Sequence, residues 1–307
     1  MRLTFCETPK NKNPVLLLGT FDGVHKGHQK LIQKGKKRSA ERQRPLVIST
    51  LHPHPLRLIA QKTVPKEITT MLERGMILAK MEVDEMLVWH FTKKLRDLSP
   101  KDFIEQMILP INPAHIIVGY DYTFGKKGEG TTRMLKEMGD TYGFSVEEIP
   151  PVTNGGKIIS STEIRLLLEK GEVAQANHLL SRPYSLQGEV VHGKKAGGKL
   201  GFPTANLLPS PEKILPAFGV YIAKVQTAQG IYPAVINVGS QPTIPSGKTT
   251  LEAHLLNQNT DLYGQKIRVF LLKEIRKEKK FSTPTDLQKQ VQIDIATAKT
   301  YFLSTPL

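Results

Sequence analysis

The sequence predicts an α/β domain built on a parallel sheet, followed by an all-β domain that ends in a helix. The chain has 307 residues, which is roughly two domains at about 150 residues each. Its first half alternates apolar strand-like runs with amphipathic helical stretches, a pattern typical of βαβ units. After Arg182-Pro183 the apolar runs are short, closely spaced and separated by Gly and Pro, which favours an antiparallel barrel or sandwich. We therefore predict one domain over residues 1–183 and a second over residues 184–307.

The strands and helices of the first domain follow in order from these runs. The expected strands are Val15–Leu18, Leu46–Leu51, Met86–Phe91, His115–Val118 and Phe144–Ile149. The expected helical stretches are Lys26–Ser39, Ile68–Met81, Phe103–Leu109 and Thr132–Tyr142. Ligands of a parallel sheet bind beyond the carboxyl ends of its strands, so polar motifs that directly follow these strands are candidate site residues.

The second domain is predicted to be a series of short strands with one helix at its end. The expected strands are Ser185–His192, Gly219–Gln226, Ile231–Val238, Thr249–Leu256 and Ile267–Leu272. The stretch Thr285–Phe302 is predicted to be helical because its apolar residues recur at helical spacing. No internal repeat or low-complexity tract is visible in either half.

Composition excludes several classes of protein. The single cysteine, Cys6, excludes an intramolecular disulfide framework and any multi-cysteine zinc or iron–sulfur site. The longest apolar runs fall far short of the roughly 18 residues needed to span a bilayer, so no membrane partner is expected. The first ten residues lack an apolar core and include Glu7, unlike a signal peptide. We therefore predict a cytoplasmic protein.

Net charge is the one unusual global property. Lys and Arg number 43 and Asp and Glu 28, which gives a formal net charge of +15 at pH 7 and a sequence pI near 9.7. This balance suits a polyanionic partner, either nucleic acid or a small phosphate-bearing substrate. The basic residues are spread along the chain, as is typical of solvated helix and loop faces. Nucleic acid is therefore not the expected partner and is kept as an alternative.

The first candidate site is the block Gly19-Thr-Phe-Asp-Gly-Val-His-Lys-Gly-His28, which follows a buried strand and opens a helix. Its three glycines let the backbone approach a ligand closely, and the helix points its N-terminus at whatever binds there. His25 and His28 are three residues apart and share one face of the first helical turn. Two imidazoles in that place can stabilise charge on the α-phosphate of a triphosphate and on departing pyrophosphate. A metal pair is the rival interpretation, but no third ligand lies nearby at useful spacing.

A second block, Ile159-Ser-Ser-Thr-Glu-Ile-Arg165, also opens a helix. Ser160 and Glu163 have the spacing of a capping box, and the arginine lies one turn into the helix. A helix N-terminus with hydroxyls and a guanidinium also suits phosphate binding, and the two interpretations are compatible. Two further blocks, Leu51-His-Pro-His-Pro55 and Val118-Gly-Tyr-Asp-Tyr-Thr-Phe-Gly125, each lie at the end of an expected strand.

In this order, the four blocks resemble the adenylyltransferase half of bacterial bifunctional riboflavin kinase/FAD synthetases, which are nucleotidyltransferases with an HxGH motif. The resemblance implies a Rossmann-like domain that cleaves ATP between its α- and β-phosphates, with His25 and His28 as catalytic residues. The residues that it implies for nucleotide binding are Gly19, Phe21, Asp22, Gly27, Asp121, Phe124, Gly125, Ser160, Ser161, Thr162 and Arg165. Aminoacyl-tRNA synthetases with a related histidine block are the alternative, but the chain is short for one and lacks their Lys-Met-Ser-Lys-Ser loop.

The second candidate site centres on Gly201-Phe-Pro-Thr-Ala-Asn206. If this block enters a strand, Thr204 and Asn206 share one face of it. Their oxygens are hard ligands that suit Mg²⁺, which takes its remaining oxygens from water and nucleotide phosphates. A hydrogen-bonded turn is the alternative for a Thr-x-Asn pair.

Two stretches that flank this block add to the site. The basic, glycine-rich stretch His192–Leu200 upstream could cover phosphates. Downstream, Leu251–Leu256 alternates in polarity, so that Glu252 and His254 share a face. A carboxylate there could take the proton from an attacking hydroxyl, although a solvent-facing glutamate is the simpler interpretation of one alternating strand.

Together these blocks resemble the riboflavin kinase domain, a small Greek-key β-barrel. The resemblance to the bifunctional family thus covers nearly the whole chain in the family's domain order. In that family a threonine and an asparagine hold Mg-ATP and a barrel glutamate activates the 5′-hydroxyl of riboflavin, which implies these roles for Thr204, Asn206 and Glu252. The remaining residues implied for nucleotide binding are Gly193, Lys199, Gly201 and Pro203.

The expected function is therefore flavin cofactor synthesis: phosphorylation of riboflavin to FMN with Mg-ATP, then adenylylation of FMN to FAD with release of pyrophosphate. The partners would be riboflavin, FMN, ATP and Mg²⁺, and a homo-oligomer is compatible with the sequence. Gly198 and Gln241 stand where the family usually has arginine, which removes two bidentate phosphate contacts. An FMN adenylyltransferase with a weak or lost kinase half is therefore one alternative. A basic nucleic-acid-binding or regulatory protein that reuses the fold is another.

Overall fold

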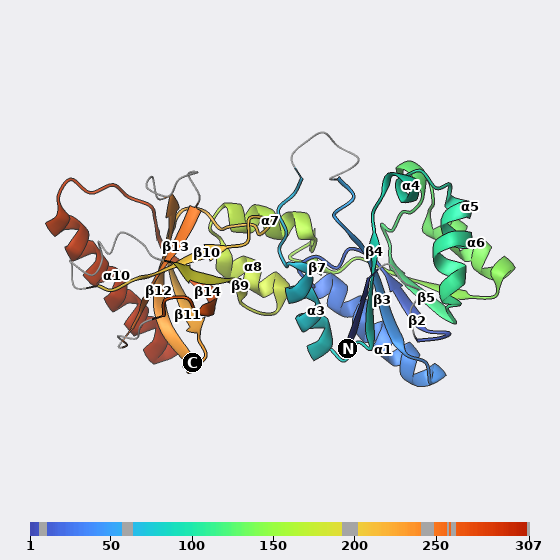
Figure 1. The fold of residues 1–307 in the computed structure, drawn as a ribbon, viewed down its shortest axis with the longest axis horizontal. Helices are drawn as coiled ribbons and strands as arrows, with labels where there is room; N and C mark the ends of the chain where they lie inside the picture. The colour runs from blue at the N-terminus through green and yellow to red at the C-terminus, as the bar shows by residue number, and fades with distance from the viewer. Residues whose placement is uncertain are drawn as a thin grey trace. The chain divides into compact units, whose positions relative to one another are not determined.

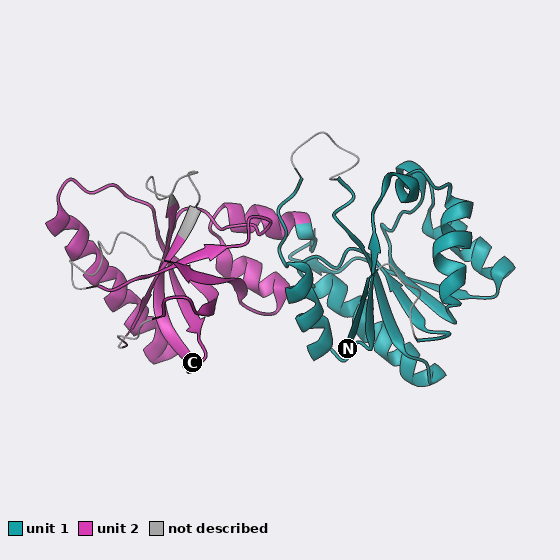
Figure 2. Cartoon of the chain, in the orientation of Figure 1, with its two compact units in different colours: residues 1–161 teal, residues 162–307 magenta. Residues whose placement is uncertain are grey.

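The chain forms two compact units, Met1–Ser161 and Thr162–Leu307 (Figure 2). They carry the two expected fold classes. The residues that the computed structural model describes are 1–5, 11–56, 64–191, 202–240, 249–256, 258 and 262–305.

The units divide earlier than the predicted boundary at residue 183. The reason is that two helices, α7 (Ser161–Glu169) and α8 (Val173–Leu180), fall almost entirely in the second unit. In α8, the amide of Asn177 donates to the carbonyl of Leu271 at 2.8 Å and accepts from the backbone N–H of Tyr184 at 2.6 Å. These bonds tie α8 to the strands of the barrel, while the boundary at residue 183 stays a prediction.

The first unit is built on a six-stranded parallel sheet with the strand order β1-β4-β3-β2-β5-β6 (Figure 1). Five strands lie within one residue of their predicted bounds, and the Rossmann-like fold class is confirmed. The edge strand β1 was not expected, because Thr4 is its one buried residue. The strands are β1 (Arg2–Phe5), β2 (Val15–Leu18), β3 (Leu46–His52), β4 (Glu85–His90), β5 (His115–Gly119) and β6 (Ser145–Ile149).

Helices cover both faces of this sheet. One face carries α1 (Lys26–Arg42) and α3 (Met71–Lys80). The other carries α5 (Pro100–Phe103), the π-helical segment η1 (Ile104–Ile108) and α6 (Thr132–Tyr142). The remaining short elements of the unit are α4 (Lys93–Arg96), η2 (Leu109–Ile111), η3 (Lys126–Gly128), β7 (Thr153–Asn154) and β8 (Lys157–Ile158).

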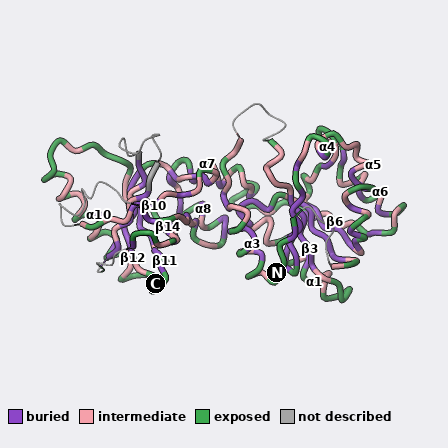
Figure 3. The backbone as a smooth tube through the Cα atoms, viewed as in Figure 1, coloured by how far each residue is buried: buried purple, intermediate pink, exposed green. Residues whose placement is uncertain are grey.

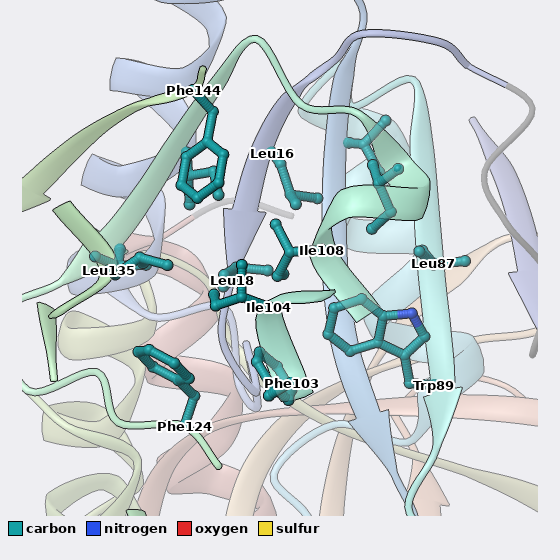
Figure 4. Packing of buried hydrophobic residues seen from close by; sticks show 14 of the residues in the cluster. Leu16, Leu18, Leu87, Trp89, Phe103, Ile104, Ile108, Phe124, Leu135 and Phe144 are labelled. Atoms are coloured by element: carbon teal, nitrogen blue, oxygen red, sulfur yellow. The ribbon is translucent and has the colours of Figure 1, made fainter. Parts of the chain in front are cut away.

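The sheet can serve two cores because successive side chains of a strand point to opposite faces. In β2, Leu16 and Leu18 join the cluster around Phe103 (Figure 4), whereas Val15 and Leu17 join the cluster on the side of α1. Figure 3 shows the buried strands in the middle of the unit. A strand buried on both faces is encoded as a continuous apolar run, which is why the sequence predicts β2 so closely.

The order of the strands reverses between β2 and β5. From β2 the chain extends the sheet through β3 and β4, whereas from β5 it extends the other side through β6. The loops that leave these two neighbouring strands therefore diverge at the carboxyl edge of the sheet, where open parallel sheets bind their ligands. Gly19–His28 follows β2 at this edge, and Tyr120–Gly125 follows β5.

Glu147 of β6 lies opposite the basic face of α1, where it binds two cations. Its carboxylate is 2.7 Å from Lys34 Nζ and 2.8 Å from Arg38 Nε, and its side chain is 22% exposed. Burial by itself would raise the pKa of Glu147, but the hydrogen bonds from Arg38 and Lys34 outweigh burial and lower the pKa to about 2. The folded state therefore prefers the charged carboxylate more strongly than the unfolded state does.

This difference predicts a pH-dependent contribution to stability. Because the pKa is lowered on folding, the contribution is present above the pKa of the unfolded chain and is lost as the pH falls toward 2. We expect Glu147→Gln to lower the free energy of unfolding by about 1–2 kcal/mol at pH 7, allowing for solvent screening, and by almost nothing near pH 2. Urea unfolding of the wild type and the variant, followed by the fluorescence of Trp89, the single tryptophan, measures this difference in the free energy of unfolding. A difference in the free energy of unfolding that stays constant between pH 7 and pH 2 would contradict the prediction. The control is Glu137→Gln, a change at an exposed glutamate.

The second unit is a closed six-stranded antiparallel barrel with the strand order β10-β13-β12-β11-β14-β9 (Figure 1). The all-β prediction is confirmed, together with the terminal helix α10 (Pro284–Ser304). In the described ranges, no helix has both the length and the apolar character that crossing a bilayer requires. The strands are β9 (Tyr184–Val191), β10 (Ala205–Pro209), β11 (Gly219–Gln226), β12 (Ile231–Ser240), β13 (Thr249–Leu255) and β14 (Lys266–Lys277).

Helix α10 is held on the outside of the barrel by apolar packing and by one buried ion pair. Arg276 of β14 donates from Nη2 to Asp294 Oδ2 at 2.9 Å and from Nε at 3.0 Å, and Asp294 is 2% exposed. A buried carboxylate needs such a partner, so the pair sets where α10 lies on the barrel. The apolar cluster beside it contains Val220, Ile222, Val235, Leu256 and Ala298.

Candidate active sites

The first candidate site is the loop between β2 and α1, whose backbone is strained. Phe21 and Val24 have φ angles of 49° and 42°, and Gly23 has a φ of 81°. The left-handed region is unfavourable for residues with a Cβ, and most of all for a β-branched valine. The conformation therefore persists because contacts around the loop impose it.

This loop brings the two histidines together at the start of α1. His25 caps the helix, and its Nδ1 accepts from the backbone N–H of His28 at 3.4 Å. The two rings are stacked, with centroids 3.7 Å apart and planes 22° apart, and the ring of Phe21 lies 5.0 Å from that of His28. A Cβ at Gly27 would lie 3.0 Å from the His25 ring. Glycine at this position therefore leaves room for the paired imidazoles.

Asp22 is turned into the protein beneath the loop. It is 3% exposed, and its carboxylate accepts from the backbone N–H groups of Ile68 and Thr69 at 3.1 and 2.9 Å. These bonds hold the loop against the segment that precedes α3. The nucleotide-binding role expected of Asp22 stays a prediction, and the geometry gives its side chain a structural role.

Gly19 stands at the start of the same loop. A Cβ at this position would lie 3.2 Å from the Phe21 ring.

The loop after β5 lies at the same edge of the sheet. Asp121 is exposed there. Phe124 is 4% exposed and packs on Phe103, with centroids 5.4 Å apart, so it belongs to the core below the edge. Gly125 has a φ of 73°, and a Cβ there would lie 2.9 Å from the backbone N of Pro100. Packing thus accounts for Phe124 and Gly125, whereas Asp121 is presented to solvent; their binding roles stay predictions.

The hydroxyl-rich block that opens α7 contacts the histidine loop through Ser161. Ser161 Oγ donates to the carbonyl of Asp22 at 2.9 Å, across 139 residues of sequence. Ser160 directly precedes the helix and is half-buried. Thr162, which is exposed, and Arg165, which is half-buried, continue the same helix in the second unit. The structure therefore joins the start of this block to the first motif.

Sequence reasoning missed two residues of this site, Thr69 and Arg74. Both are 4% exposed and both contact the histidine loop. The signal near them was a capping box at the start of α3, in which Thr70 and Glu73 bond each other's backbone N–H groups. That pattern predicts a helix start, but it carries no information about which distant loop the helix supports.

The second candidate site lies on the barrel, where three neighbouring strands align polar residues. Asn206 of β10 is paired in register with Glu252 of β13, which is paired in register with Asn237 of β12. Side chains of such cross-strand partners lie on one face, with Cβ atoms about 5 Å apart. Asn206 is 5% exposed and Glu252 half-buried. The structure thus brings two of the predicted residues together, and Asn237 completes the row.

The segment before β10 lies beside this row. Thr204 directly precedes the strand, which begins at Ala205. The carbonyl of Pro203 lies 3.0 Å from His254 Nδ1, and the His254 ring meets the ring of Phe202 edge-on, with centroids 5.9 Å apart. His254 follows Glu252 on the same face of β13, so this strand supports the segment that carries Thr204.

The donor atoms of this site fit magnesium better than a transition metal. No group of three or more His, Cys, Asp or Glu in the described part of the chain could hold a metal ion. The residues predicted for the second site would instead offer the hydroxyl of Thr204 and the amide oxygen of Asn206, with one carboxylate on the next strand. Mg²⁺ is bound through few protein oxygens, with water and phosphates completing its shell. Gly193, Lys199, Gly201, Gly198 and Gln241 lie outside the described residues.

Comparison with known proteins gives matches to both halves of the chain. A family model described as FAD synthetase matches residues 7–163, and one described as riboflavin kinase matches residues 180–302. Proteins named bifunctional riboflavin kinase/FMN adenylyltransferase from Bacillus subtilis (strain 168) and Escherichia coli (strain K12) are each 36% identical, over 94% of this chain and 92% of their own length. A Streptococcus pneumoniae crystal structure titled a macrolide-efflux protein superposes with a TM-score of 0.90 at 31% identity, covering 97% of this chain and 99% of that chain.

Proposed function

This chain belongs to the bifunctional riboflavin kinase/FMN adenylyltransferase family, and from this premise we propose how its two units divide the work. The enzyme phosphorylates riboflavin to FMN with ATP and adenylylates FMN to FAD. The first unit performs the adenylyl transfer and the second the phosphorylation. The observation that carries this assignment is the stacked pair of His25 and His28, which lies at the strand-order reversal where an open parallel sheet binds a nucleotide.

In the first unit, an oxygen of the FMN phosphate attacks the α-phosphorus of ATP. The bond to the oxygen between the α- and β-phosphates breaks, and pyrophosphate leaves with the electron pair. Because His25 Nδ1 accepts a hydrogen bond within the protein, a neutral His25 carries its proton on Nε2, the nitrogen that donates to the phosphates. His25 and His28 stabilise the charge that develops, and Ser160, Thr162 and Arg165 hold phosphates. Ser161, whose hydroxyl donates to the carbonyl of Asp22, holds them through its backbone N–H at the start of α7. No protein nucleophile is needed, because positioning and electrostatics supply the catalysis.

In the second unit, the 5′-hydroxyl of riboflavin attacks the γ-phosphorus of ATP. Glu252 takes the hydroxyl proton, while the bond from the γ-phosphorus to the β,γ-bridging oxygen breaks and ADP leaves. Thr204 and Asn206 would hold Mg²⁺, which when bound neutralises charge on the phosphates. The pairing of Asn206 with Glu252 on adjacent strands supports this assignment, because a metal ligand and a base that act on the same ATP have to lie side by side.

The net positive charge serves phosphate-bearing substrates in this proposal. Several cations of α1 are already paired within the first unit, which leaves them less available to a nucleic acid: Lys34 and Arg38 pair with Glu147, and Lys36 pairs with Glu82. The enzyme's dependence on ATP supports a cytoplasmic location.

That the chain forms a homo-oligomer stays a prediction.

Product analysis tests the proposed function. The purified protein is incubated with Mg-ATP and either riboflavin or FMN, and the flavins are resolved by chromatography. We expect FMN and then FAD from riboflavin, and FAD with equimolar pyrophosphate from FMN. FAD from supplied FMN without any conversion of riboflavin would restrict the activity to the first unit. Failure to convert either flavin would refute the proposal.

A further inference from the structure

Arg74 of α3 is a buried cation that the chemistry above does not use. Its side chain is 4% exposed. A guanidinium stays protonated inside a protein, so its burial is unfavourable unless polar groups surround it. Its contacts therefore show what the residue does in the fold.

Those contacts run to the loop that carries the histidines. Arg74 Nη1 donates to the carbonyl of Thr20 at 2.8 Å. Its Nη2 lies 3.3 Å from Asp22 Oδ1 and donates to the carbonyl of Thr69 at 3.2 Å. One planar group thus joins the start of α3 to two residues of the loop, which a flexible ammonium could not do at once.

Thr69 completes the connection. Its Oγ1 accepts from the backbone N–H of Gly23 at 2.9 Å and donates to Asp22 Oδ1 at 3.0 Å. Asp22, Thr69 and Arg74 together form a buried set that we call the loop anchor. Through Arg74 and Thr69, the loop anchor holds the backbone of Thr20 and Gly23, which lie shortly before His25.

The loop needs this support because of its backbone conformation. Phe21 and Val24 both lie in the left-handed region, which their side chains disfavour. Val24 directly precedes His25, so any relaxation of the loop displaces the imidazole that caps α1. A displacement of about 1 Å at a catalytic group can reduce a rate on the order of 100-fold.

We propose that Arg74 is a positioning residue for FMN adenylylation, acting through the loop anchor to hold His25 and His28 in place. The inference rests on the adenylyltransferase activity proposed for the first unit. Arg74 contributes to the rate of the chemical step through the histidines, and not to the binding of ATP or FMN.

The test compares Arg74→Met and Arg74→Lys with the wild type in steady-state FAD formation. We expect Arg74→Met to lower kcat by about 10- to 100-fold, with the KM values for ATP and FMN within about twofold of wild type. Arg74→Lys should recover part of the loss, because its ammonium can reach one of the acceptors. Riboflavin phosphorylation by the second unit of the same chain should stay at the wild-type rate. The matched control is Arg133→Met on α6, an exposed arginine paired with Glu137.

A double-mutant cycle with Thr69→Val separates the loop anchor from a general loss of stability. If both residues act through one network, the loss in the double variant should be close to that of the more impaired single variant. Additive losses, an unchanged kcat, or a raised KM for ATP at normal kcat would each overturn the inference. So would an equal loss of kinase activity. Should Arg74→Met fail to fold, Arg74→Lys and Thr69→Val carry the same test. A wild type that makes no FAD would refute the proposed function instead.

Discussion

Replacing both His25 and His28 with alanine is expected to reduce FAD formation from FMN and ATP by at least about 1,000-fold, because each donor that stabilises charge in a transition state contributes on the order of 100-fold or more. The two rings stack at 3.7 Å over the start of α1, so they act on the same part of the ligand. The KM for ATP should change little, since the lost interactions belong to the transition state. Steady-state kinetics of FAD formation measure both parameters.

Riboflavin phosphorylation by the same double variant should be unchanged, which shows that the chain is folded. His90→Ala, at the exposed end of β4, is the control for removing an imidazole from this edge of the sheet. FAD formation that survives within tenfold of wild type would contradict the role of the histidines. A raised KM with an intact kcat would show that they bind the nucleotide without stabilising the transition state.

Glu252→Gln is expected to have the complementary effect on the second unit. The amide keeps the size of the side chain but cannot take the proton of the riboflavin 5′-hydroxyl, so kcat for FMN formation should fall by about 100-fold or more. FAD formation from supplied FMN should continue at the wild-type rate. Parallel assays with riboflavin and with FMN on one preparation measure the two activities.

Glu189→Gln is the matched control, because Glu189 is an exposed glutamate on β9, a strand of the same barrel that does not pair with β13. It should leave both activities unchanged. Full kinase activity in Glu252→Gln would show that the glutamate is a solvent-facing strand residue. A loss of both activities would instead indicate a folding defect.

The local part of each site could be predicted because it depends on short-range geometry. A spacing of three residues places His25 and His28 on one face of any helix, and the apolar run of β2 places that helix after a buried strand. Alternation in β13 likewise puts Glu252 and His254 on one side of the strand. These relations hold within one element, so they needed no knowledge of its neighbours.

The roles of individual loop residues could not be predicted in the same way. Asp22 and Phe124 lie inside motifs that resemble a nucleotide site, yet the structure turns Asp22 toward Ile68 and Thr69 and buries Phe124 on Phe103. Side chains within one motif can face the ligand or the core, and the motif alone does not distinguish the two. Strand β1 was missed for a related reason, since an exposed edge strand carries little apolar signal.

By itself, the sequence determined the two fold classes, the elements that carry the motifs and the residue types available for chemistry, because periodicity and spacing are local properties of the chain. Only the tertiary structure decided which distant segments support each site: Arg74 and Thr69 beneath the histidine loop, and Asn237 beside Glu252. Those contacts depend on how helices pack on the sheet and how strands pair in the barrel. Packing and pairing join residues far apart in sequence, and no local pattern encodes which residues will meet.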